Sequence, residues 1–168
     1  MSRVLVAYGS KHGATAEIAQ AIAQEIGCQG IEADCLPADE VHDVAPYDGV
    51  VVGSAVYMKR WRRPAQQLLR RHQHELSERP LWIFSSGPVG EDADPSWSEP
   101  GKVVDLAEKL GVRDHVVFGG KLPDEPEGLM QKAMVKDIPE EFRDLRDFDQ
   151  IRSWAAGIAE AVRVKAQT

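Results

Sequence analysis

Short apolar runs alternate with helical patterns along the whole 168-residue chain. The first run spans Arg3 to Tyr8 and has four consecutive apolar residues at its centre, as in a parallel strand that is covered on both faces. From Ala14 to Ile26 an isoleucine recurs every four residues, which predicts an amphipathic helix. The same reading predicts strands at 31–36, 48–53, 81–84 and 115–118, a short helix at 39–44, and longer helices at 64–76, 99–110 and from about 148 onward.

Strands that alternate with helices favour an α/β fold with a parallel, doubly wound sheet. Five strands fit the order 2-1-3-4-5, in which a ligand crevice lies beyond the carboxyl ends of strands 1 and 3. We expect residues 1–168 to form one domain of ordinary size.

The connection at about 119–146 is longer than a minimal five-stranded domain needs. It separates the last strand from the last helix and is rich in prolines and acidic residues. Four apolar residues at helical spacing lie within it: Leu129, Met130, Ala133 and Met134. Two interpretations stay open for this insert, a short helix packed on the sheet edge or a flap over a ligand.

Composition narrows the functional classes. A net charge of −7 disfavours nucleic-acid binding as the main role. No apolar run approaches the roughly 20 residues of a membrane-spanning helix, and the N-terminus has no signal-peptide layout. We therefore expect a cytoplasmic protein with at most peripheral membrane contact. Cys28 and Cys35 form no Cys-x-x-Cys pair and are expected to be reduced thiols, and no metal-ligand spacing occurs.

The first loop, Ser10 to Thr15, joins a buried strand to a helix start and is the main candidate for ligand binding. Three residues separate Gly9 from Gly13, so the spacing of a Walker nucleotide loop is not met, and the dinucleotide fingerprint G-x-G-x-x-G is absent. Free backbone N–H groups at the helix N-terminus, with the Ser10 and Thr15 hydroxyls, can surround a phosphate. The alternative is a plain helix cap formed by Ser10 or Thr15.

Two further loops follow strands 3 and 4 and should lie at the same end of the sheet. Small residues in the second loop would let a flat ring approach the backbone, and Tyr57 or Trp61 could stack on it or instead cover the core. Together the loops predict FMN, with its phosphate at the first loop and its ring at the other two. The predicted cofactor-binding residues are Ser10, Lys11, His12, Gly13, Ala14, Thr15, Ser54, Ala55, Val56, Tyr57, Ser86, Gly87, Pro88, Val89 and Gly90.

Ser10-Lys11-His12-Gly13-Ala14-Thr15 resembles the phosphate loop of the flavodoxin family, with His12 where Thr is common. The resemblance extends over nearly the whole chain and implies a flavodoxin-like fold, FMN and electron transfer. Within the family, the chain looks like the menaquinone-dependent protoporphyrinogen oxidase branch, on the stretch Val50–Tyr57, the basic segment after it and the insert. That branch implies an oxidoreductase of haem biosynthesis, with a porphyrinogen substrate and a quinone acceptor.

Several functions stay open at this point. The chain is an FMN-dependent oxidoreductase of that type, a pure electron-carrier flavodoxin with a redox partner protein, a quinone reductase, or a binding module that has lost its flavin. We nominate no catalytic side chain, because a bound flavin carries out the redox chemistry itself. The basic stretch from Lys59 to Arg71 is either a solvated helix face or a docking surface for an acidic partner or for porphyrin propionates.

Overall fold

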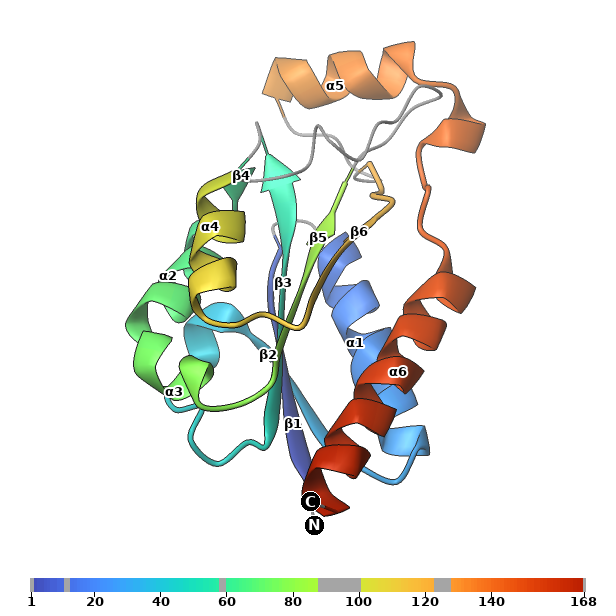
Figure 1. Cartoon of the computed structure of the whole chain (residues 1–168). Helices are drawn as coiled ribbons and strands as arrows, with labels where there is room; N and C mark the ends of the chain where they lie inside the picture. Colours follow the sequence, from blue (N-terminus) through green and yellow to red (C-terminus); the bar gives the residue numbers. More distant parts are fainter. Residues whose placement is uncertain (1, 11–12, 58–59, 88–100, 123–127, 168) are drawn as a thin grey trace.

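The computed structural model describes residues 2–10, 13–57, 60–87, 101–122 and 128–167, and its centre is a parallel sheet (Figure 1). The strand order is β2-β1-β3-β5-β6, which is the predicted 2-1-3-4-5 order once the strands of the main path are counted in sequence. A short strand, β4, pairs with β3 in the antiparallel direction. The bounds are β1 Arg3–Gly9, β2 Glu32–Pro37, β3 Gly49–Tyr57, β4 Arg60–Trp61, β5 Leu81–Ser86 and β6 Asp114–Phe118.

Helices cover both faces of the sheet (Figure 1). The helices α1 and α6 lie on one face, and α2, α3 and α4 lie on the other. The remaining helix, α5, lies beyond the carboxyl ends of the strands. The bounds are α1 Ala14–Cys28, η1 Ala38–Glu40, α2 Arg63–Arg71, α3 Gln73–Ser77, α4 Gly101–Lys109, α5 Gly128–Asp137, η3 Glu140–Phe142 and α6 Phe148–Gln167.

The continuous apolar run of β1 is explained by these two layers. Val4 and Val6 belong to the cluster beneath α1 and α6, whereas Leu5 and Ala7 belong to the cluster beneath α2 and α4. Because alternate residues of a strand point to opposite faces, a strand with a helix layer on each side must be apolar at every position. The predicted isoleucine face of α1 is fully buried in the first of these clusters.

The prediction that the third strand ends at Gly53 is wrong. The strand β3 continues to Tyr57, pairs with β5 at Ser54 and Ala55, and turns back through β4. Residues 54–57 are therefore strand residues rather than part of the expected loop. The β-branched and aromatic residues Val56 and Tyr57 favour an extended backbone, and that preference outweighs the small residues before them.

The predicted helix over residues 64–76 is divided into two. It ends at Arg71, and α3 begins after His72, whose backbone has φ −111° and ψ 30°. The apolar side chains still lie inward, since Leu68, Leu69 and Leu76 are buried. The short helix expected at 39–44 is likewise reduced to the single turn η1.

The helical spacing inside the insert is confirmed by α5, which crosses the region beyond the carboxyl ends of the strands rather than running along an edge strand (Figure 1). Leu129 on this helix is 88% exposed. Within the described ranges, no helix combines the length and apolarity needed to cross a membrane.

Candidate functional site

The three predicted loops start side by side at one end of the sheet. Gly9 at the end of β1 pairs with Ser54 on β3, and Ser54 pairs with Ser85 on β5. One residue further along, Ala55 pairs with Ser86, and Ser86 pairs with Phe118 on β6. The carboxyl ends of the central strands thus bring together the segments that the sequence assigns to one ligand site, as expected for this topology.

The first loop enters α1 through a glycine in the left-handed region. Gly13 is the N-cap residue, with φ 86°, and it forms no side-chain cap. The N–H of Gly13 donates to the Ser10 Oγ at 3.0 Å. A capping hydroxyl normally accepts a backbone N–H from the first helical turn, whereas Ser10 accepts the N–H of the cap residue Gly13 itself. Thr15 lies inside the helix and is buried. This geometry differs from the plain cap considered above. Lys11 and His12 lie outside the described residues.

The segment after Gly53 is tied into the β3–β4 hairpin. The Ser54 hydroxyl is buried, accepts the Arg62 N–H at 2.8 Å and lies 2.8 Å from the Ala55 carbonyl oxygen, to which it donates. Ala55 and Val56 are half-buried, and of Tyr57 only the backbone, at the end of β3, is described. The flavin-binding role of residues 54–57 stays a prediction.

Trp61 covers the core, which is one of the two interpretations left open for it. Its indole is buried and its Nε1–H donates to the Ser85 Oγ at 2.9 Å. The same Ser85 Oγ lies 3.2 Å from His115 Nε2 on β6. Trp61 and His115 therefore both contact the buried hydroxyl of Ser85, which lies on β5 one residue before the end of the strand.

The third loop is described only at its first residues. Ser86 is buried at the end of β5, and Gly87 has φ 149°, a backbone conformation that favours glycine. The Gly87 N–H donates to the Phe118 carbonyl oxygen at 3.1 Å. Pro88, Val89 and Gly90 lie outside the described residues.

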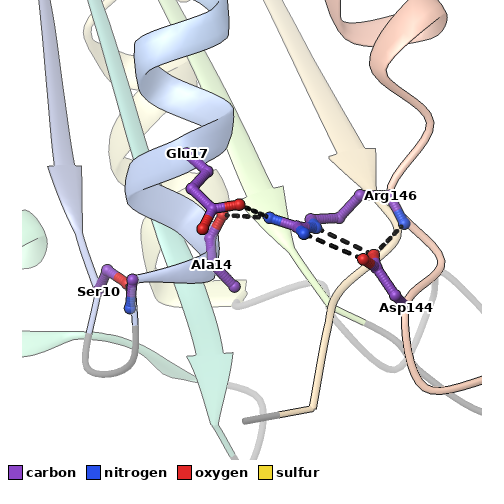
Figure 2. Close-up of polar contacts among 6 residues, drawn as sticks. Ser10, Ala14, Glu17, Asp144 and Arg146 are labelled. Atoms are coloured by element: carbon purple, nitrogen blue, oxygen red, sulfur yellow. Dashed lines mark hydrogen bonds and ion pairs between the residues drawn. The ribbon is translucent and has the colours of Figure 1, made fainter. Parts of the chain in front are cut away.

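The sequence reasoning missed Arg146, which reaches the first turn of α1 from the far end of the insert (Figure 2). Its Nη1 donates to Glu17 Oε2 at 2.6 Å and to the Ala14 carbonyl oxygen at 3.3 Å. Its Nε and Nη2 donate to the two carboxylate oxygens of Asp144 at 2.9 and 3.0 Å. No motif or periodicity could have indicated this contact, because 129 residues separate Glu17 from Arg146.

These contacts shift the pKa values of Asp144 and Arg146 beside the first loop. The hydrogen bond from Arg146 lowers the pKa of Asp144 below its ordinary value. The hydrogen bonds to Asp144 and then to Glu17 raise the pKa of Arg146 above its ordinary value. Both groups therefore stay ionised across the neutral range, and one guanidinium is shared between two carboxylates next to α1.

The two cysteines are predicted to differ in reactivity. Cys28 is exposed, whereas burial raises the pKa of the half-buried Cys35 to about 11. Since the thiolate is the reactive form, Cys35 should react slowly with a disulfide reagent at pH 8 and Cys28 quickly. Two kinetic phases are expected, with Cys28→Ser removing the fast phase and Cys35→Ser the slow one. A fast phase that survives in Cys28→Ser would contradict this assignment.

The comparison with protein families decides the class of this site. A family model described as "Flavodoxin domain" matches residues 5–148, which is most of the chain. The chain belongs to the flavodoxin family. None of the curated proteins compared matches it significantly in sequence.

Solved structures agree with this assignment at the level of the fold. A flavodoxin from the domain Archaea has a TM-score of 0.65 and 15% identity, over 96% of this flavodoxin domain and 99% of that chain. A point mutant of flavodoxin from Pseudomonas aeruginosa has a TM-score of 0.62 and 19% identity, over 96% of this chain and 99% of that one. Rubredoxin oxygen:oxidoreductase from Desulfovibrio gigas has a TM-score of 0.67 and 15% identity, and the match covers the whole of this chain but only 38% of that one.

Flavodoxins bind FMN, so the family assignment confirms the predicted cofactor. The described residues fit its phosphate end. Among the residues that the structure describes, no atom lies within 4 Å of a Cβ placed on Gly13, and this left-handed glycine turns the chain into α1 beside the Ser10 hydroxyl. This hydroxyl, and N–H groups at the start of a helix, are the donors that a phosphate requires.

Proposed function

We propose that this flavodoxin domain holds FMN at the carboxyl ends of β1, β3 and β5 and passes electrons between the flavin and a redox partner. The observation that carries the proposal is the first loop, where the Gly13 turn and the Ser10 hydroxyl stand at the start of α1 within a flavodoxin-family chain. When bound, FMN supplies one- and two-electron redox chemistry.

The N-terminal turn of α1 and residues 10–15 would hold the phosphate, and residues 54–57 and 86–90 are the predicted partners of the ring. Ser54 and Ser85 are both buried: the Ser54 hydroxyl holds the backbone of the β3–β4 hairpin, and the Ser85 hydroxyl holds the side chains of Trp61 and His115. No side chain is assigned a catalytic role.

We propose further that the electrons come from a substrate of the porphyrinogen class, with a quinone as acceptor, in haem biosynthesis in the cytoplasm. The support is the sequence resemblance to the protoporphyrinogen oxidase branch and the position of α5 beyond the carboxyl ends of the strands, where an enzyme must hold a bulky substrate (Figure 1). A large insert at this end is more than a pure electron carrier requires.

A pure electron carrier or a quinone reductase is the second candidate, and one observation favours a protein partner. Arg60, Arg63, Arg70 and Arg71 lie on β4 and α2, directly after the second loop segment, and all four are exposed. A one-sign patch beside a redox site steers an acidic partner toward it, in a salt-dependent manner. The same patch suits the propionate groups of a porphyrinogen.

The visible absorption of the purified chain tests the proposed cofactor. We expect oxidised-flavin bands after reconstitution with FMN, and their bleaching by a chemical reductant. Gly13→Ala should weaken FMN retention, because a Cβ at φ 86° strains the turn by about 1–2 kcal/mol. Gly27→Ala, at the other end of the same helix and with open space around its Cβ, is the matched control.

A chain that takes up no FMN would contradict the proposal and favour a binding module that has lost its flavin. For the reaction itself, the reconstituted protein is mixed anaerobically with a porphyrinogen and a quinone. Porphyrin formation supports the oxidase type. Reduction of the quinone by a nicotinamide donor without porphyrinogen turnover supports the reductase, and flavin reoxidation by an acidic redox protein alone supports the carrier.

A further inference from the structure

Arg146 is an enclosed charged side chain beside the candidate site. Only 6% of its side chain is exposed, compared with 57% for Glu17 and 44% for Asp144. Its guanidinium carbon lies 5.1 Å from the centroid of the Phe148 ring, which covers it from α6. Figure 2 shows Arg146 spanning from the insert to the first turn of α1, with Ser10 on the other side of that turn in this view. The arginine is therefore held by several contacts at once.

Glu17 explains why a cation is needed at this place. It is the acidic residue in the first turn of α1, where the helix dipole attracts negative charge. A phosphate at the same helix start is attracted by the same N–H groups and dipole, and it carries a charge of about −1.5 to −2 at pH 7. Without Arg146, the Glu17 carboxylate would lose this ion-pair partner beside the phosphate loop.

Two segments pair at the base of the insert, residues 119–122 and residues 143–146, and we call this paired region the neck. Arg146 is its last residue. The Leu145 N–H donates to the Gly120 carbonyl oxygen and the Leu122 N–H to the Arg143 carbonyl oxygen, both at 2.8 Å. A Cβ at Gly119 would lie 2.1 Å from the Leu145 carbonyl oxygen, and one at Gly120 would lie 2.8 Å from Gly87 Cα. The neck therefore packs against Gly87 at the start of the third loop, while Arg146 binds Ala14 and Glu17 at the end of the first loop and the start of α1.

We propose that Arg146 is a positioning residue for phosphate binding: it holds and neutralises the Glu17 carboxylate at the first turn of α1, and the backbone pairing at the base of the insert holds Arg146 in place. The proposal rests on the proposed binding of FMN. Arg146 acts on α1 and Glu17, and no contact between Arg146 and the phosphate is invoked.

The test compares FMN with riboflavin, which has the same ring but no phosphate. Dissociation constants for both are measured by flavin fluorescence quenching for the wild-type chain and four variants: Arg146→Met, Arg146→Lys, Glu17→Gln and Arg146→Met with Glu17→Gln. Arg152→Met is the control, since Arg152 lies on α6 and forms an exposed ion pair with Asp149. We expect Arg146→Met to weaken FMN binding about tenfold and riboflavin binding less than about twofold, because the lost neutralisation acts on the phosphate charge.

The other variants isolate the cause. Glu17→Gln in the Arg146→Met background should restore most of the FMN affinity, and Arg146→Lys should lie between wild type and Arg146→Met, because a lysine keeps the charge but cannot bind Asp144 with two parallel hydrogen bonds. Glu17→Gln alone changes an exposed side chain and should tighten FMN binding about twofold to threefold at low salt. This single variant keeps the proposal testable if Arg146→Met does not fold. The Arg152→Met control should match wild type.

Three results would overturn the proposal. Equal losses of FMN and riboflavin affinity would show that Arg146 only maintains the fold. Unchanged FMN binding in Arg146→Met, or unchanged or weaker FMN binding in Glu17→Gln alone, would show that the Glu17 charge does not act on the phosphate. If the wild-type chain bound neither flavin, the proposed function would fail and this proposal with it, an outcome distinct from the other two because it appears without any substitution.

Discussion

Replacing Gly53 by alanine is expected to destabilise the fold by about 3 kcal/mol or more, the upper end for overpacking a core. A Cβ on Gly53 would lie 2.0 Å from Phe84 Cζ and 2.1 Å from Phe84 Cε1. Phe84 is fully buried and packs on Phe118 and Trp154, with ring centroids 5.7 and 6.2 Å away. The ring therefore has little room to give way, and the strand or the aromatic cluster must shift.

Urea unfolding followed by tryptophan fluorescence and circular dichroism measures the loss. Gly157→Ala is the matched control, because its Cβ meets nothing within 4 Å and the residue lies inside α6. That control should gain about 0.5–1 kcal/mol through the lower helix propensity of glycine. Phe84→Leu combined with Gly53→Ala should cost less than the sum of the two single changes, since contacting residues couple by about 0.5–3 kcal/mol. A Gly53→Ala chain as stable as wild type would refute the role of the Phe84 ring.

Gly53 also shows where sequence reasoning reaches its limit. The glycine and the small residues after it predict a loop that admits a flat ligand ring, yet in the structure the flat ring over Gly53 is that of Phe84. A glycine indicates that something lies close to the backbone, but the sequence does not say whether a ligand or another side chain does so. The partner comes from a neighbouring strand and is known only once the sheet register is known.

The two covered faces were predictable because burial leaves a strong pattern in the sequence, and the strand order followed from the doubly wound topology that five strands alternating with helices fit. Four apolar residues in succession on β1 and a four-residue isoleucine repeat on α1 are each explained by one helix layer on each side of the sheet. The break at His72 was not predictable in the same way. Leu68, Leu69 and Leu76 remain buried whether the helix is continuous or interrupted, so their spacing does not reveal the turn.

In the candidate site, too, the features that are local in sequence were predictable, and the contacts between distant segments were not. Ser10 and Gly13 are close together in sequence, and a turn between a strand and a helix can be recognised locally. The grip of Arg146 on α1 depends on two segments that lie more than a hundred residues apart and on the pairing at the base of the insert. Neither partner belongs to a motif, and only the folded chain shows that an arginine of the insert neutralises an acid beside the phosphate loop.

Saturating FMN is expected to raise the free energy of unfolding by about 4 kcal/mol when free FMN stands at about 1,000 times its dissociation constant. The reason is that the phosphate site exists only in the folded chain: the Gly13 turn, the Ser10 hydroxyl and the first turn of α1 are brought together by β1 and its neighbours. An unfolded chain offers none of these groups in a fixed arrangement. Urea midpoints measured across a series of FMN concentrations should therefore rise with the logarithm of free FMN.

Three controls make this titration specific to the phosphate site. Riboflavin should stabilise less at equal concentration, because it lacks the group that α1 attracts. Gly13→Ala should require more FMN for the same rise, while Gly27→Ala should follow wild type. Hydrogen exchange should slow first at the backbone N–H groups of residues 13–17, where the phosphate is expected to bind. An unfolding curve that does not move with FMN would show that the chain keeps the flavodoxin fold without its cofactor, and the insert would then have to be understood as the binding surface of a protein without redox function.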